Sequence, residues 1–151
     1  MKPIILEGSW VINAPRQRIY DIVTDFEHAS TYFPLVATSL KITSRNGDHL
    51  SINAVAKTFG IPFHVSMDTQ LLPTIGFTSI NTSILAIENE SFLMEDVPNG
   101  TKILYRNEVQ IKNTALQIFG KILIGKPALL FWKLAYIVRL QKLATDTQEY
   151  A

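Results

Sequence analysis

Hydrophobic and polar residues alternate over most of the first three quarters of the chain, as expected for β-strands with one buried face. The alternation is clearest at residues 63–71, where Phe63, Val65 and Met67 share one face and polar residues occupy the other. Asn46-Gly47 is a hairpin turn signal. The same pattern predicts further strands at residues 4–12, 37–45, 49–58, 77–86, 91–97 and 101–111. These strands predict an antiparallel sheet with one apolar face.

Helical periodicity replaces this alternation near the start of the chain and again at its end. Pro15 begins a short helix, and a second short helical piece at residues 28–33 stops at Pro34. Residues 114–147 predict a C-terminal helical segment whose main helix spans residues 127–145. The residues expected to break or kink its first part are Gly120, Gly125 and Pro127.

The main helix carries two apolar stripes when its residues are projected at 100° per residue. The first stripe consists of Leu129, Trp132, Tyr136, Leu140 and Leu143. The second consists of Phe131, Leu134, Ala135 and Val138. Because a helix that covers one sheet needs a single apolar face, we expect both stripes to be covered. Four covers remain open, namely a sheet curved around the helix, a ligand in a cavity, a second copy of the chain, or a membrane.

The order of these elements, together with three short segments, resembles the START-like or SRPBCC superfamily, and most of all its polyketide cyclase/dehydrase and lipid-transport group. The segments are Ile12-Asn13-Ala14-Pro15, residues 19–26 and Tyr32-Phe33-Pro34. In this chain Tyr32 or Phe33 replaces the tryptophan that is usual near the second helix. The resemblance covers essentially the full length and predicts a single domain of residues 1–151.

The resemblance implies an α+β helix-grip fold, in which a seven-stranded curved antiparallel sheet surrounds a long C-terminal helix. Two short helices would follow the first strand, and an elongated cavity would lie between the sheet and the final helix. Members of the superfamily bind lipids, sterols, polyketides, plant hormones or quinones. Some are enzymes and many only bind or carry, so the fold alone does not decide between these roles.

Composition narrows the classes of partner. With 14 basic and 13 acidic residues the net charge is +1, which argues against a nucleic-acid partner. The chain has no cysteine, so disulfides, thiol catalysis and cysteine-ligated zinc are excluded.

No long apolar run of a signal peptide is present at the N-terminus, and a cytoplasmic location is expected. Five basic residues at positions 121–142 are compatible with peripheral membrane contact, and a homodimer contact is the alternative.

Motifs that carry chemistry are scarce in this sequence. His28, His49 and His64 show no metal-ligand spacing, and neither a phosphate-binding glycine loop nor a Gly-x-Ser-x-Gly motif occurs. We therefore expect no metal and no cofactor. Asp21 and Asp25 lie four residues apart on the first helix, where we expect them to face water rather than to act as an acid–base pair. Enzymatic activity remains open, and binding without catalysis is favoured.

The predicted apolar face of the sheet is interrupted by Thr69, Thr82, Tyr105 and Asn107. An apolar wall with a few polar groups is typical of a ligand pocket. A buried Asn107 amide must find partners in a ligand, a backbone group or a water molecule, whereas the Tyr105 hydroxyl is expected to reach solvent. The candidate ligand-binding residues are Trp10, Phe33, Met67, Thr82, Tyr105, Asn107, Phe131 and Trp132.

These residues favour the binding or transport of a hydrophobic small molecule, such as a lipid, an isoprenoid, a quinone or a polyketide-like compound. The molecule would enter near residues 33–36. The first alternative is a cyclase/dehydrase-type enzyme with an acid–base pair inside the cavity, such as Tyr105 and a water molecule held by Asn107. This alternative gains if two or more titratable groups point inward. The second alternative is an interaction module that docks on a membrane or a protein.

Overall fold

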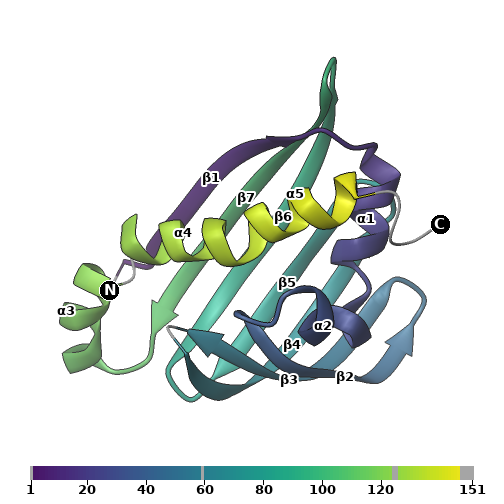
Figure 1. The fold of residues 1–151 in the computed structure, drawn as a ribbon. Helices are drawn as coiled ribbons and strands as arrows, with labels where there is room; N and C mark the ends of the chain where they lie inside the picture. The colour runs from purple at the N-terminus through teal and green to yellow at the C-terminus, as the bar shows by residue number, and fades with distance from the viewer. Residues whose placement is uncertain (1, 59, 124–125, 147–151) are drawn as a thin grey trace.

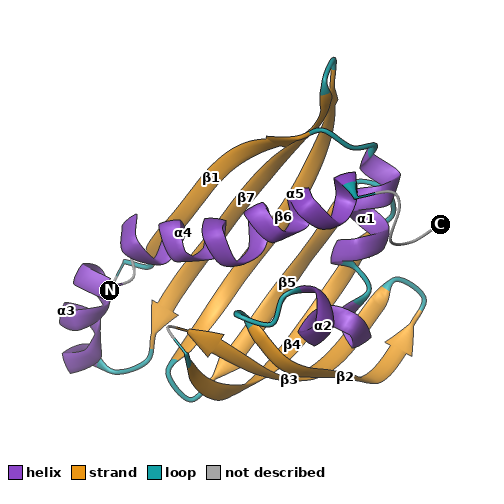
Figure 2. Ribbon diagram, viewed as in Figure 1, coloured by secondary structure: helices purple, strands orange, loops and turns teal. Residues whose placement is uncertain are grey.

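The computed structural model describes residues 2–58, 60–123 and 126–146. The strands are β1 (Ile4–Ile12), β2 (Ala37–Asn46), β3 (His49–Thr58), β4 (Ile61–Leu72), β5 (Gly76–Ser83), β6 (Ala86–Val97) and β7 (Gly100–Ile111). The helices are α1 (Arg16–Val23), η1 (Phe26–His28), α2 (Ala29–Tyr32), α3 (Thr114–Leu123), α4 (Lys126–Trp132), η2 (Lys133–Ile137) and α5 (Val138–Thr145). Figure 2 shows the α+β architecture that the sequence predicts, with two short helices between β1 and β2.

The strands form one antiparallel sheet in the order β1-β7-β6-β5-β4-β3-β2. From β2 to β7 each strand pairs with its neighbour in the sequence, and β1 closes the order by pairing with β7. Register shifts interrupt β2 between Ala37 and Ser39 and between Ile42 and Ser44. Such bulges bend a strand, and Figure 1 shows the sheet curving beneath the C-terminal helix. This is the predicted helix-grip fold.

Two glycines permit close approaches at the starts of strands. Gly76 and Gly100 have φ values of 144° and 142°, which side chains rarely allow. A Cβ atom would lie 1.8 Å from the carbonyl oxygen of Phe92 at Gly76, and 2.1 Å from that of Ile12 at Gly100. Glycine at these two positions therefore lets β5 begin against β6, and β7 begin beside the end of β1.

The C-terminal helix is continuous from Lys126 to Thr145 and crosses the concave face of the sheet (Figure 1). It agrees with the main helix predicted at residues 127–145, but its middle five residues, Lys133–Ile137, form a π-helical turn that the sequence did not indicate. The expected break at Gly120 is wrong, because α3 continues through it to Leu123. A glycine inside a helix costs only about 1 kcal/mol relative to alanine. Gly125 lies outside the described residues.

The first apolar stripe of the helix faces the sheet, where Leu140 is fully buried and Leu143 is 4% exposed. The second stripe is not covered along its length as expected. Ala135 is buried, but Leu134 and Val138 are 58% and 50% exposed. The sheet covers only the side of the helix that faces it, which leaves these two side chains at the surface. Their contact with a membrane or a second copy of the chain stays a prediction.

Two arginines fix the C-terminal half of the helix to the short helices after β1. The Nε atom of Arg18 donates to the carbonyl oxygen of Ala144 at 2.8 Å, and the Nε atom of Arg139 donates to that of Tyr32 at 2.9 Å. Side chains of this kind satisfy carbonyl groups at the end of a helix that lack partners within it. No helix in the described ranges is both long enough and apolar enough to cross a membrane.

Candidate ligand-binding cavity

A cavity of about 280 Å³ lies between the concave face of the sheet and the C-terminal helix. This volume is near the lower end of the range of roughly 300–1,000 Å³ that is usual for small-molecule sites. Most of the lining is apolar and aromatic, and it comes from the sheet, from the short helices and from α4 and η2. The aromatic residues in the lining include Phe33, Phe77, Phe92, Phe131, Trp132 and Tyr136.

Four aromatic rings form a continuous stack along one side of this cavity. The ring centroids of Tyr105 and Trp132 are 3.9 Å apart, those of Trp132 and Tyr136 are 4.8 Å apart, and those of Tyr136 and Phe33 are 4.0 Å apart. Each stacked pair contributes roughly 0.5–1.5 kcal/mol beyond its buried area. The stack links β7 to the end of α2 through the helix, so it forms a rigid aromatic wall beside the cavity.

The polar part of the lining is built on the neighbouring strands β5, β6 and β7. Glu88 lies opposite Asn81, and Glu90 lies opposite Asn107. All four line the cavity. The Tyr105 hydroxyl donates to Oε2 of Glu90 at 2.7 Å, and Nδ2 of Asn81 donates to Oε1 of the same residue at 3.4 Å. The sheet register thus brings two carboxyl groups and two amides together at one place.

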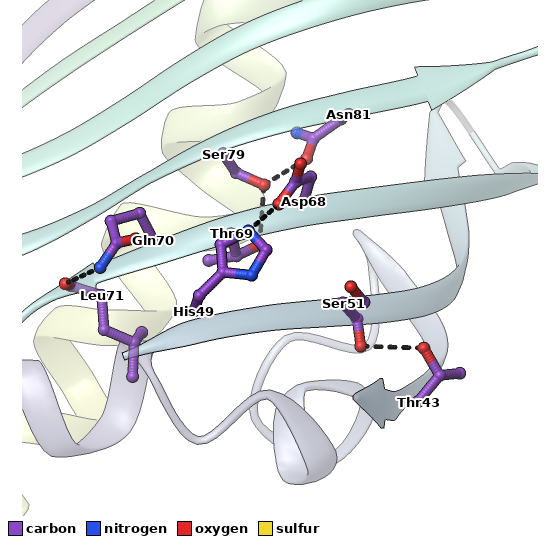
Figure 3. Close-up of polar contacts among 9 residues, drawn as sticks. All are labelled: Thr43, His49, Ser51, Asp68, Thr69, Gln70, Leu71, Ser79 and Asn81. Atoms are coloured by element: carbon purple, nitrogen blue, oxygen red, sulfur yellow. Dashed lines mark hydrogen bonds and ion pairs between the residues drawn. The ribbon is translucent and has the colours of Figure 1, made fainter. Parts of the chain in front are cut away.

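A chain of hydrogen bonds between buried side chains orients the Asn81 amide (Figure 3). The hydroxyl groups of Thr69 and Ser79 are 2.8 Å apart, and Ser79 donates to Oδ1 of Asn81 at 2.7 Å. Because Oδ1 accepts from Ser79, the amide nitrogen of Asn81 points toward the carboxyl groups. Fully satisfied networks of this kind hold their members in one arrangement.

Burial raises the pKa values of both carboxyl groups. Burial, and next to it the charge of Glu90, raises the pKa of Glu88 to about 7, although side-chain hydrogen bonds from Asn107 and Asn81 oppose the shift. Burial likewise raises the pKa of Glu90, against the hydrogen bonds from Tyr105 and Asn81. Burial and the neighbouring Glu90 also raise the pKa of Tyr105 well above its usual value. Near neutral pH, Glu88 can therefore either release or accept a proton.

One polar atom in the described lining of the cavity has no hydrogen-bond partner. Asn107 is 5% exposed, and its Oδ1 atom has no hydrogen-bond donor among the residues that the structure describes. A buried acceptor without a partner costs about 1–3 kcal/mol. A hydrogen-bond donor on a bound molecule would remove this cost.

Six of the eight residues that the sequence predicted for the site line the cavity, and two do not. Trp10 packs behind Trp132, with ring centroids 5.5 Å apart. Thr82 is exposed, because it is Asn81 that faces inward at this point of β5. The Tyr105 hydroxyl does not reach solvent as expected, since it donates to Glu90. The six residues in the lining are Phe33, Met67, Tyr105, Asn107, Phe131 and Trp132.

The sequence prediction missed Glu88 and Glu90. It placed a strand at residues 91–97, whereas β6 begins at Ala86. Residues 87–90 fall between the predicted strands at 77–86 and 91–97, so the prediction assigns Glu88 and Glu90 to no inward face. Alternation continues through it, because Ile87 is 38% exposed and Glu88 and Glu90 line the cavity, but with polar residues on the inner side.

Solved structures with the same fold are numerous, although their sequences are distant. The di-domain ARO/CYC BexL of the BE-7585A biosynthetic pathway aligns with a TM-score of 0.79 and 15% identity over 94% of this chain and 50% of its own. The Zhui aromatase/cyclase of Streptomyces sp. R1128 aligns with a TM-score of 0.78 and 10% identity over 93% and 92%. A START superfamily protein of Mycobacterium smegmatis aligns with a TM-score of 0.77 and 16% identity over 92% and 98%.

The chain has the same fold as these three proteins, one of which is a START superfamily protein. This agrees with the fold that the resemblance implies. No protein-family model and no curated protein matches the sequence. The chain spans about half the length of BexL, and at identities of 10–16% the likeness establishes architecture only. The activities that name these neighbours are properties of those proteins.

Proposed function

We propose that the protein binds a hydrophobic small molecule in this cavity, with the polar group of the molecule against Glu88, Glu90 and Asn107. The observation that carries the proposal is the unpaired Oδ1 of Asn107 at the polar part of an otherwise aromatic space. Such a space lined by apolar groups, with a few polar groups that fix orientation, is the usual form of a small-molecule site. Phe33 and Val36 both line the cavity, which supports an opening at residues 33–36.

Extraction of the purified protein with organic solvent, followed by mass spectrometry, is expected to yield a bound hydrophobic molecule. Ala56→Phe should reduce its occupancy at least about tenfold, because Ala56 lines the cavity and a phenyl ring there would fill much of the space. Thr82→Phe is the matched control, since Thr82 lies on the exposed face and the variant should retain the molecule. Empty extracts from folded wild-type protein, together with no thermal stabilisation by a lipid panel, would contradict the proposal.

An acid–base enzyme of the cyclase/dehydrase kind is the second candidate. It is favoured by the presence of several titratable groups in the lining, namely Glu88, Glu90 and Tyr105. An aldol cyclisation with loss of water requires one group to remove a proton from carbon and one to protonate the departing hydroxyl. Glu88, with a pKa of about 7, is suited to the first task in its ionised form and to the second in its protonated form.

If this second candidate is correct, a linear poly-β-ketone mimic should cyclise with a rate that changes with an apparent pKa near 7. In Glu88→Gln this inflection should disappear and the rate should fall by roughly 10²–10⁴-fold, the usual contribution of a general acid or base. Product formation followed by absorbance between pH 5 and pH 9 measures both effects. A rate equal to the uncatalysed background would remove the enzyme candidate and leave the binding proposal intact.

A further inference from the structure

We propose that the molecule in the cavity is a hydrophobic amine, with its ammonium group held between Glu88, Glu90 and Oδ1 of Asn107. The inference rests on the proposed function, because it assigns the chemical class of the molecule that the cavity binds. It is carried by the geometry of the polar cluster and by the charges that surround it.

The polar cluster has more acceptors than donors. Glu88 and Glu90 receive hydrogen bonds from the amides of Asn81 and Asn107 and from the Tyr105 hydroxyl, and all of these donors are neutral. Oδ1 of Asn107 receives none from the described residues. Reversal of the Asn107 amide would not help, because its nitrogen already donates to Glu88. When both carboxyl groups are ionised, a bound molecule that completes this cluster must therefore bring hydrogen-bond donors.

The described lining supplies little positive charge near these acids. Lys57 lines the cavity, but it lies at the far end of β3, opposite Pro62, and its Nζ is 3.5 Å from the carbonyl oxygen of Pro34. The interactions that shift the pKa values of Glu88 and Glu90 include no basic side chain. Arg106 forms its ion pairs with Glu7 and Glu108. Among the described residues the carboxyl pair thus lacks a counter-charge, which a ligand could provide.

An ammonium group fits this requirement better than the other common polar groups of lipids. It carries a positive charge and three N–H donors, and hydrogen bonds to charged partners are about twice as strong as those between neutral groups. A hydroxyl group offers one donor and no charge. A carboxylate would bring a further negative charge to a site where burial and the charge of Glu90 already raise the pKa of Glu88.

Three ligands with the same chain and different polar groups test the inference directly, namely decylamine, decanol and decanoate. Titration calorimetry of the intact protein at pH 7 is expected to show decylamine binding at least about tenfold more tightly than decanol, with decanoate weakest. Decylamine should also release up to about half a proton per molecule bound, since an ammonium group lowers the pKa of the half-protonated Glu88. Measurements in two buffers with different ionisation enthalpies give this number.

Glu88→Gln keeps the shape of the side chain and removes its charge, so it should lower decylamine affinity at least about tenfold and abolish proton release. Its decanol affinity should change by less than about threefold. Glu95→Gln on the same strand is the matched control, because Glu95 is exposed and should leave all three affinities unchanged. The comparison of ligands on the wild-type protein does not depend on either variant.

The possible outcomes separate this inference from the function on which it rests. Equal binding of decylamine and decanol, tighter binding of decanoate, or amine binding without proton release would overturn the assignment of an amine and leave the cavity as a binding site. Failure of all three ligands to bind, with solvent extracts that are also empty, would contradict both the amine assignment and the proposed binding function.

Discussion

Leu140→Ala is expected to lower the free energy of unfolding by about 2–5 kcal/mol, whereas Leu134→Ala on the same helix should lower it by less than about 0.5 kcal/mol. Leu140 is fully buried in the main apolar core, together with Ile137 and Leu143. Truncation there leaves a void that the surrounding helix and sheet cannot fill by a small movement. Leu134 is 58% exposed and loses little contact when it is shortened.

Urea denaturation followed by circular dichroism measures both changes, and equal slopes of the transitions would show that only stability differs. The pair tests which side of the helix the sheet holds. A loss of 2 kcal/mol or more in Leu134→Ala would mean that the second stripe is covered in solution, for example by a second copy of the chain. A loss below 1 kcal/mol in Leu140→Ala would contradict the packing of the helix against the sheet.

The sequence identified the first stripe of this helix correctly, but it did not show which residues of the second stripe are buried and which are exposed. A projection at 100° per residue assumes 3.6 residues per turn throughout, and the π-helical turn at Lys133–Ile137 breaks that assumption. Residues on either side of the turn are rotated relative to the projected positions. Consequently Ala135 faces the core, whereas Leu134 and Val138, assigned to the same stripe, are half exposed.

Strand prediction succeeded where alternation and burial agree. β1 and β3 have the predicted bounds, and β7 differs by one residue, because their inward positions are mostly apolar. The resemblance supplied what periodicity does not contain, namely the order of strands in the sheet and the helix that lies across it. Sequence alone thus predicted the cavity's location and much of its aromatic wall.

Prediction failed at β5 and β6, where the inner face is polar. Ser79 and Asn81 are buried while Ile80 between them is 49% exposed, and Glu88 lines the cavity while Ile87 is 38% exposed. The rule that apolar residues face inward therefore gave the wrong face for Thr82 and hid the two acids. Local disagreement between pattern and structure is expected at functional sites, and the inverted alternation at residues 77–90 is itself a signal of a polar site inside the sheet.

Glu88→Gln is expected to stabilise the protein by about 3 kcal/mol at pH 8 and to change its stability little at pH 4. The pKa of Glu88 rises from 4.5 to about 7 on folding, so the folded state binds the proton more tightly than the unfolded state. The stability that this preference provides is fully present below pH 4.5 and is lost as the pH rises through 7. A rise of this size corresponds to about 3 kcal/mol. Glutamine stays neutral, and its Oε1 can still accept from Asn107 or Asn81.

Urea denaturation of wild type, Glu88→Gln and Glu95→Gln at pH 4 and pH 8 measures the effect, with the exposed Glu95 as the control for loss of one negative charge. A difference between wild type and Glu88→Gln that does not vary with pH would contradict the raised pKa.

The ionised form of Glu88 thus lowers the stability of the ligand-free protein above pH 7, and a bound cation should reverse that effect. Decylamine at concentrations well above its dissociation constant should therefore raise the free energy of unfolding of the wild type at pH 8 by RT ln(1 + [L]/Kd), where [L] is the free decylamine concentration. It should raise the free energy of unfolding of Glu88→Gln much less.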